Sequence, residues 1–172
     1  TAINALLAVG AVHQKLVKLG LRSDANIVIS TSSARDTHQI ACLIGFGATA
    51  VYPSLAYQTI LDLSERNELK GTPHGNCARY RKGINKGLLK IISKMGISTI
   101  SSYRGSQLFE IVGLNDELVN LCFTNSITRI QGKSLDNLDK EMRNLDSYAR
   151  SNLSDISVGG LLKYVHGGES VS

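Results

Sequence analysis

Residues 26–52 read NIVISTSSARDTHQIACLIGFGATAVY, a pattern that predicts a β-α-β unit. The first five, 26–30, are mostly apolar and rich in β-branched side chains, as in a strand buried on both faces of a parallel sheet. Ser32 or Ser33 can cap the helix that follows, and a second strand is expected at 48–52. Because such units close right-handedly, the two strands are predicted to be parallel neighbours.

The rest of the chain repeats this alternation of helices and strands. We expect a helix that Thr1 caps and that runs to about Leu19, helices at about 54–67 and 79–95, a strand at 97–101, helices near 106–112 and 116–121, and a helix over 134–150. Glycine pairs at 159–160 and 167–168 mark an irregular tail. The predicted fold class is therefore α/β, built from short parallel β-α-β units.

Composition indicates one folded domain or two small lobes rather than a disordered or fibrous chain. The 172 residues are 42% hydrophobic with a mean hydropathy of -0.01, which is enough to bury a core. No apolar run approaches the roughly 18 residues of a membrane span, since the best candidate, 5–12, ends at His13. The N-terminus shows neither a signal peptide nor an initiator methionine. We therefore interpret the sequence as an excised cytoplasmic fragment without a membrane partner.

The net charge of +5 is concentrated in the second half of the chain. Residues 1–75 hold six Lys/Arg and five Asp/Glu, while residues 76–172 hold thirteen and nine. This divide coincides with the one cluster of turn-forming residues that carries no apolar periodicity. We expect a linker at 71–78 that separates two parts, 1–70 and 79–172.

Four lysines advance by four residues along the helix expected at 79–95: Lys82, Lys86, Lys90 and Lys94. They cover about 120° of one helix face, opposite an apolar side. Such a stripe can meet the phosphates of a polyanion, or it is the solvated face of an amphipathic helix. Few arginine or aromatic side chains accompany it, which favours the solvated face and no nucleic-acid partner. A freestanding α/β polyanion-binding module stays as the alternative, recognisable by an affinity that falls steeply with salt.

Residue spacing identifies no active site. The residues considered are His13, His38, His74, His166, Cys42, Cys77, Cys122, Asp136, Asp139 and Glu141. No two histidines stand at metal-ligand spacing, and the distant cysteines are typical of buried free thiols in a reducing compartment. The pair His74 and Cys77 lies at the expected linker, where a nucleophile would lack a fixed base, and the three carboxylates follow one exposed helix face. We expect no catalytic, cofactor-binding or metal-binding residue in this chain.

Several longer strings resemble one family closely. They are GFGATAVYPSLAY at 45–57, INKGLLKIISKMGISTI at 84–100 and SYRGSQLFE at 102–110. These strings, in this order, are similar to the large subunit of glutamate synthase. The resemblance implies a parent with an N-terminal glutaminase domain, a central domain, a (β/α)8 barrel that holds FMN and a 3Fe-4S cluster, and a C-terminal β-helix. It also implies internal transfer of ammonia from glutamine to 2-oxoglutarate and reduction by FMN.

The resemblance also implies where this chain lies in that parent. Residues 1–70 would close the central domain, and residues 79–172 would lead into an incomplete (β/α)8 barrel. The glutaminase, FMN and cluster motifs would all lie outside this chain, so the resemblance implies a structural segment that is inactive by itself. Its partners would be the remaining domains of the same chain, with a ferredoxin or a small subunit supplying electrons to the parent.

Overall fold

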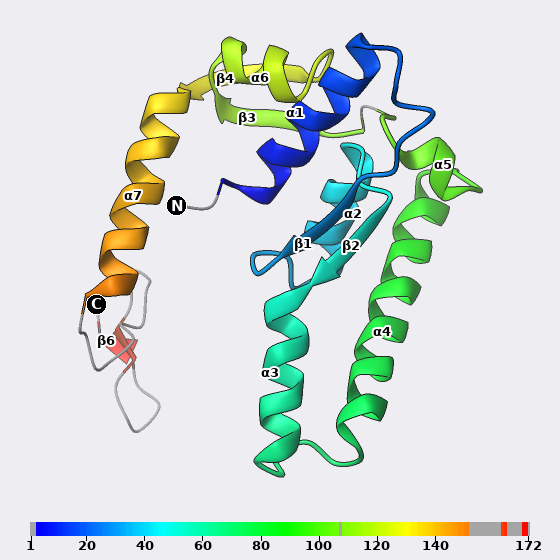
Figure 1. The fold of residues 1–172 in the computed structure, drawn as a ribbon, viewed down its shortest axis with the longest axis vertical. Helices are drawn as coiled ribbons and strands as arrows, with labels where there is room; N and C mark the ends of the chain where they lie inside the picture. Colours follow the sequence, from blue (N-terminus) through cyan, green and yellow to red (C-terminus); the bar gives the residue numbers. More distant parts are fainter. Residues whose placement is uncertain (1–2, 107, 152–162, 165–169, 172) are drawn as a thin grey trace.

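A computed structural model describes residues 3–106, 108–151, 163–164 and 170–171 (Figure 1). The helices are α1 (Ala5–Lys18), α2 (Thr37–Gly45), α3 (Ser54–Glu65), α4 (Pro73–Lys94), α5 (Ile100–Tyr103), α6 (Asp116–Cys122) and α7 (Leu135–Arg150). The strands are β1 (Val28–Thr31), β2 (Ala50–Pro53), β3 (Glu110–Leu114), β4 (Ile127–Lys133), β5 (Lys163–Tyr164) and β6 (Ser170–Val171). The predicted α/β class, with short parallel strands, is confirmed. Within the described part of the chain, no helix is both long and apolar enough to cross a membrane.

The β-α-β unit predicted from residues 26–52 is present. Strands β1 and β2 pair in parallel, with Val28 opposite Ala50 and Thr31 opposite Pro53. The helix cap differs from the prediction, because Asp36 and not a serine begins α2. The Asp36 carboxylate accepts a hydrogen bond from the Gln39 N–H at 2.8 Å, and the Gln39 side chain accepts one in return from the Asp36 N–H. This reciprocal capping box satisfies two free N–H groups, which a serine cap alone would not.

The expectation that β1 is buried on both faces is wrong. Val28 is 70% exposed, and the described residues give this sheet two strands. Ile27, Ile29 and Val51 pack against the core cluster on the other face. A parallel strand becomes buried on both faces only when layers cover both sides of its sheet. In the described chain only one side of this sheet is covered.

The segment 71–78, expected to be a linker, is a tight turn followed by the first part of α4. Thr72 caps the helix by accepting a hydrogen bond from the Gly75 N–H at 3.1 Å, and Pro73 occupies the first turn, where its missing N–H costs nothing. Helix α4 therefore begins at Pro73 instead of near Arg79. It runs beside α3 as a helical hairpin (Figure 1), joined at the turn by the buried Asn76 amide, which donates to the Ser64 hydroxyl at 2.9 Å.

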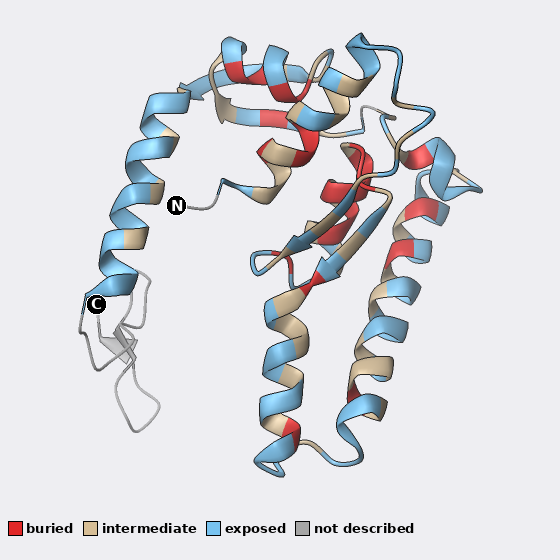
Figure 2. Cartoon of the chain, viewed as in Figure 1, coloured by how far each residue is buried: buried red, intermediate tan, exposed pale blue. Residues whose placement is uncertain are grey.

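One hydrophobic core joins residues from both sides of this turn. It contains Val9, Ala34, Ile40, Ala41, Leu43, Ile44, Ala48, Leu88, Ile92 and Tyr103. Figure 2 shows this core around α2 and along the inner face of α4. A second cluster lies where α1 meets β3 and α6, and it consists of Leu7, Ile111, Leu118, Val119, Cys122 and Phe123. Helix α1 contributes to both clusters and holds the two halves of the fold together.

Two expected elements between 97 and 112 are wrong. Where a strand is expected at 97–101, residues 97–99 are irregular and the single turn α5 follows. Tyr103 of α5 is 1% exposed, and the hydroxyls of Thr99 and Ser102 bond each other locally. Such local bonds compete with strand ladders. The helix expected near 106–112 is absent from its described residues: 106, 108 and 109 are irregular, and strand β3 begins at Glu110, with Ile111 buried.

The helices expected at 116–121 and 134–150 are confirmed as α6 and α7, but strand β4 between them was not predicted. Strand β4 pairs with β3 in parallel. The pairing register shifts twice along β3, once between Ile111 and Val112 and once between Val112 and Leu114. Strands β5 and β6 are two residues each and pair antiparallel. The glycine pairs predicted to mark an irregular tail lie outside the described residues.

Candidate functional site

A polar junction forms where α1, the loop after it and the turn after α2 meet. Its centre is Arg22, whose Nε donates to the His13 Nδ1 at 2.9 Å. The same guanidinium donates to the Ala25 carbonyl at 2.5 Å and to the Gly47 carbonyl at 2.8 Å. We call His13, Arg22 and Arg104 the His13 junction, since Arg104 approaches from the turn after α5 and donates to the Thr49 hydroxyl. The junction connects the loops that follow α1, α2 and α5 to helix α1.

The electrostatics of the His13 junction hold the imidazole neutral. Burial lowers the pKa of His13 from its ordinary value of 6.5, and the positive charges of Arg22 and Arg104 lower that pKa further. An arginine can only donate, so Nδ1 must accept, and the proton of neutral His13 resides on Nε2. The backbone of Gly47 packs closely against the His13 ring. A Cβ at position 47 would lie 2.5 Å from this ring.

The lowered pKa of His13 makes stability depend on pH. The folded state binds the proton less readily than the unfolded state, so the stabilisation is fully present above about pH 6.5 and is lost as the pH falls through the folded pKa. We expect the free energy of unfolding, measured with guanidinium chloride, to decrease between about pH 7 and pH 5. The variant His13→Gln keeps an acceptor for Arg22 but does not titrate. If the free energy of unfolding changed equally with pH in the original chain and in His13→Gln, this role of His13 would be contradicted.

A small cavity of about 180 Å³ lies in front of the His13 ring. Phe46, Phe109 and Phe123 form its apolar wall, and Gln14, Thr124 and Ser126 contribute polar groups. The three rings also contact one another, with Phe46 4.7 Å from Phe123 and 5.5 Å from Phe109 between ring centroids. The cavity therefore lies at the seam between the two hydrophobic clusters, and its residues are explained by packing.

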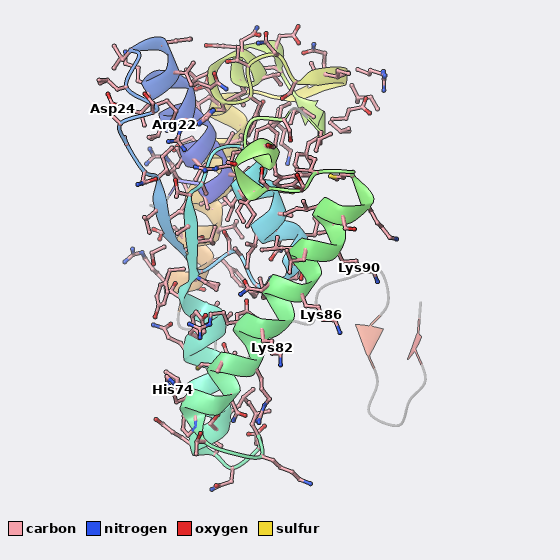
Figure 3. The ribbon with its side chains drawn as sticks, turned by 90° about the vertical axis from the view of Figure 1, so that its right-hand side faces the viewer. Arg22, Asp24, His74, Lys82, Lys86 and Lys90 are labelled. Carbon is pink, nitrogen blue, oxygen red and sulfur yellow. The ribbon has the colours of Figure 1, made fainter. Side chains whose placement is uncertain are left out.

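The lysine stripe is exposed along its whole length. Lys82, Lys86, Lys90 and Lys94 all lie on the outer face of α4, and none forms an ion pair within the part of the chain that the structure describes. Figure 3 shows the first three pointing outward in a row. The opposite face contributes Leu88 and Ile92 to the core. This is the arrangement of an amphipathic surface helix.

Among the described residues, the histidines and cysteines do not assemble a reactive centre, and His166 lies outside the described residues. Cys42 lies 3.7 Å from the His38 Nε2, but burial and the nearby Asp36 raise the pKa of its thiol, the opposite of nucleophile activation. Burial also raises the pKa of Cys122. Cys77 lies on a third helix, α4, near His74. Among the described residues, no group of three or more His, Cys, Asp or Glu side chains is placed to hold a metal ion.

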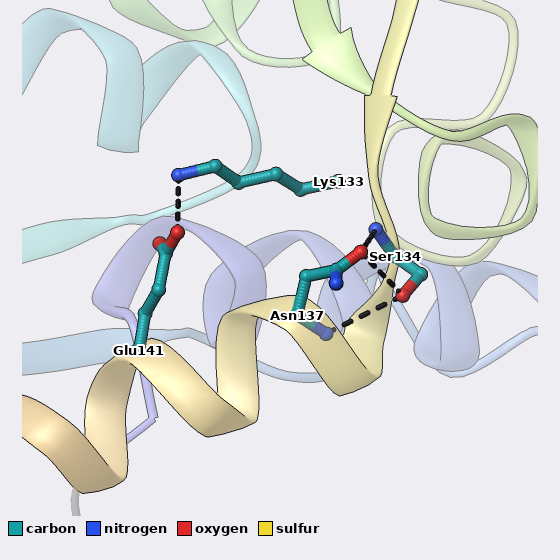
Figure 4. A network of polar contacts seen from close by, with 4 residues as sticks. All are labelled: Lys133, Ser134, Asn137 and Glu141. Atoms are coloured by element: carbon teal, nitrogen blue, oxygen red, sulfur yellow. Dashed lines mark hydrogen bonds and ion pairs between the residues drawn. The ribbon is translucent and has the colours of Figure 1, made fainter.

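The three carboxylates considered from the sequence lie on α7, as expected, and two of them form ion pairs. Glu141 pairs with Lys133 at 2.5 Å, and Asp139 pairs with Arg143 at 2.6 Å. Figure 4 shows the Lys133 pair beside the capping box of Ser134 and Asn137 at the start of α7. These exposed contacts stabilise a helix by a few tenths of a kcal/mol each and form no acid–base pair.

An apolar groove of about 800 Å³ lies between α7 and the other half of the molecule. Residues of α1 and β3 line one wall, and Leu135, Leu138, Met142 and Leu145 of α7 line the other. The sequence predicts the helix over 134–150 but not the groove that α7 borders. Arg22 and Arg104 were missed as well, because residues 13, 22 and 104 share no periodicity and come together only through the turns.

Comparison with known proteins identifies the relatives of this chain. The family model of the glutamate synthase central domain matches residues 1–115. A ferredoxin-dependent glutamate synthase of Pyropia yezoensis is 42% identical, over 98% of this chain and 12% of the relative. Ferredoxin-dependent glutamate synthase 1 of Arabidopsis thaliana is 39% identical, and the NADPH glutamate synthase large chain of Bacillus subtilis is 36% identical, each over 98% of this chain and 11% of the relative. The chain spans only about a ninth of these relatives.

Proposed function

The chain belongs to the glutamate synthase family, and we propose that it is a structural segment of a glutamate synthase large chain. One observation carries this proposal. A relative matches 98% of the chain, yet the chain accounts for only 12% of that relative's length. The ion pairs, caps and buried clusters described above all serve packing. The segment therefore supports chemistry that other parts of the parent perform.

The parent reaction is part of the proposal. The parent makes glutamate from glutamine and 2-oxoglutarate, passes ammonia internally and uses reduced FMN as the reductant. Its electrons come from a ferredoxin or from an NADPH-oxidising small subunit, in keeping with the two kinds of relatives. A cytoplasmic location, expected from the sequence, belongs to the same proposal.

We place the central-domain part of this segment further along the chain than the sequence suggested. The division into 1–70 and 79–172 puts α3 and α4 in different domains, although they form one hairpin and Leu88 and Ile92 enter the same core as Val9. The family match also runs through residue 115. Both observations support a central-domain part that extends to about residue 115, with the lead-in to the FMN barrel after it.

The described residues do not fit the 3Fe-4S cluster of the parent. A 3Fe-4S cluster needs closely placed thiolates, whereas Cys42, Cys77 and Cys122 lie on α2, α4 and α6. An FMN phosphate favours free N–H groups at a helix start, and side chains already cap the starts of α1, α2, α4, α6 and α7, though not those of α3 and α5. We therefore assign the cofactor chemistry to other parts of the parent.

The proposal predicts that this chain has no turnover of its own. We expect no glutamine- or 2-oxoglutarate-dependent formation of glutamate from the purified 172-residue chain, and no saturable quenching of FMN fluorescence at micromolar protein. The complete polypeptide that carries this segment serves as the positive control in both assays. Stoichiometric FMN binding by the short chain, with circular dichroism showing it folded, would overturn its assignment as a structural segment.

The alternative of a polyanion-binding module has no specific support in the geometry. Two side chains that could read a nucleic acid beside the lysine stripe, Arg79 and Tyr80, are already engaged. Arg79 donates to the Lys70 carbonyl and to Asn76, and the Tyr80 hydroxyl donates to the Arg35 carbonyl at 2.8 Å. Exposed lysines without stacking partners match a solvated helix face.

A further inference from the structure

The groove beside α7 is an interaction surface that the fold itself leaves open. Its apolar lining is continuous from Leu6 and Leu7 of α1, across Ile111 of β3, to Met142 of α7. Several of its apolar side chains are largely exposed, including Val112 at 61%, Leu135 at 51% and Leu145 at 63%. We call this surface the α7 groove. Contiguous exposed apolar surfaces of this kind mark sites of association.

Helix α7 is held in place by very little of its own chain. It has one strongly apolar side, yet none of its sixteen residues is buried. Its described contacts with the rest of the fold are the Lys133–Glu141 ion pair, packing against strand β4, and the half-buried Leu138 against the second core cluster. Amphipathic helices derive most of their stability from burying the apolar side. Within the described residues, the apolar side of α7 therefore lacks a partner that buries it.

The polar rim of the groove indicates the chemistry of that partner. Four lining residues are acidic, Glu110, Asp136, Asp139 and Glu141, and no lysine, arginine or histidine lines it. Asp136 has no ion-pair partner within the described residues, while the other three carboxylates pair with Arg129, Arg143 and Lys133. A small ligand would require convergent free polar groups, which this lining does not offer. An apolar segment with basic flanks complements both the floor and the rim.

A second copy of this chain fits the groove less well. A symmetric dimer would bring the same patch of each copy together, so Asp136, the rim carboxylate without an ion-pair partner among the described residues, would meet an acidic rim and no new basic group. Like charges placed opposite one another disfavour association. The remaining polypeptide of the parent, by contrast, makes up most of the length of every relative described above, since this chain covers only 11% to 12% of them. Because this remaining polypeptide is covalently linked to the segment that forms the groove, its binding there is intramolecular.

We propose that, in the complete glutamate synthase polypeptide, the α7 groove is filled by an apolar segment with basic flanks from outside residues 1–172. This inference rests on the proposed function, which supplies the longer polypeptide. The segment buries the apolar side of α7 against α1 and β3, and its lysine or arginine side chains face the acidic rim. The occupied groove then fixes α7 to the rest of the fold.

Methionine oxidation tests the proposal in the complete polypeptide. Met142 lines the groove and is half-exposed in the 172-residue chain, so an occupant must cover it. We expect hydroxyl radicals to oxidise Met142 at least about 10-fold more slowly in the native polypeptide than in the same polypeptide unfolded in guanidinium chloride. The variant Leu145→Asp should remove most of this protection. The matched control is Leu89→Asp, because Leu89 is also 63% exposed on a helix but lies outside the groove.

The outcomes separate this inference from the proposed function. Protection of Met142 that survives Leu89→Asp and is lost in Leu145→Asp supports the filled groove. Fast oxidation of Met142 in a polypeptide that makes glutamate overturns the groove proposal and leaves the function standing. Protection in a polypeptide without glutamate synthase activity overturns the function and leaves the groove proposal standing. Protection of Met142 in the 172-residue chain that grows with protein concentration, together with dimers in sedimentation, would identify a second copy as the occupant and overturn the proposal.

Discussion

Replacing Gly10 by alanine is expected to destabilise this chain by about 3 kcal/mol. Gly10 is buried on the side of α1 that crosses α6. A Cβ at this position would lie 2.3 Å from the carbonyl oxygen of Cys122 and 3.1 Å from the Phe123 ring. The contacted oxygen belongs to the backbone at the end of α6, so it cannot turn away as a long side chain would. The two helices must separate, which opens the second hydrophobic cluster.

A matched control distinguishes this clash from the general effect of glycine in helices. Gly83 lies in the exposed interior of α4, and a Cβ there would meet nothing within 4 Å. Gly83→Ala is therefore expected to stabilise the chain by about 0.5–1 kcal/mol, because alanine restricts the unfolded chain and favours the helix. Guanidinium unfolding of both variants measures the difference. If Gly10→Ala proves neutral or stabilising, the close crossing of α1 and α6 is wrong.

The longer helices of this fold could be predicted because their signals are local. The apolar spacing in α1 and α7 and the turn residues around α2 all lie within a few positions of the elements they define. Cap identity was harder, since the choice between Ser32, Ser33 and Asp36 depends on which residue has Gln39 three positions later. The parallel β1–β2 pair followed from the strand–helix–strand order, because such units close right-handedly.

The second sheet could not be predicted because its signals are divided between distant positions. Strand β3 is stabilised by β4, and α6 stands between them in the sequence. Strand β4 alternates weakly and carries polar and charged residues such as Arg129 and Lys133, so its own periodicity is poor. The paired approach of Gly113 and Gly132 is visible only once the strands are side by side. Tertiary pairing here outweighs local propensity.

The His13 junction was missed for a related reason. Arg22 lies in a loop that offers no periodicity, and its three acceptors belong to residues 13, 25 and 47. A single arginine in a loop is usually a solvated surface residue. Only the fold shows that this guanidinium donates to a ring nitrogen and to two carbonyl groups that no other described residue satisfies through a side chain.

Removing that guanidinium is the second substitution with a large expected effect. Arg22→Ala should destabilise the chain by about 2–4 kcal/mol, because it removes three charge-assisted hydrogen bonds and leaves the Ala25 and Gly47 carbonyls without this donor. Arg22→Lys should recover less than half of the loss, since one ammonium cannot reach three acceptors that a planar guanidinium spans. Guanidinium unfolding at pH 7.5 measures both variants.

The control for lost charge alone is Arg66→Ala. Arg66 forms an exposed ion pair with Asp62, and its side chain is 64% exposed, so its removal should cost no more than about 0.5 kcal/mol. The junction has an additional readout, because the positive charge of Arg22 helps to lower the pKa of His13. In Arg22→Ala the pKa of His13, followed by NMR, should move back toward its ordinary value of 6.5. A large loss of stability without that movement would indicate that Arg22 acts by packing alone, since only a charge close to the imidazole shifts its titration.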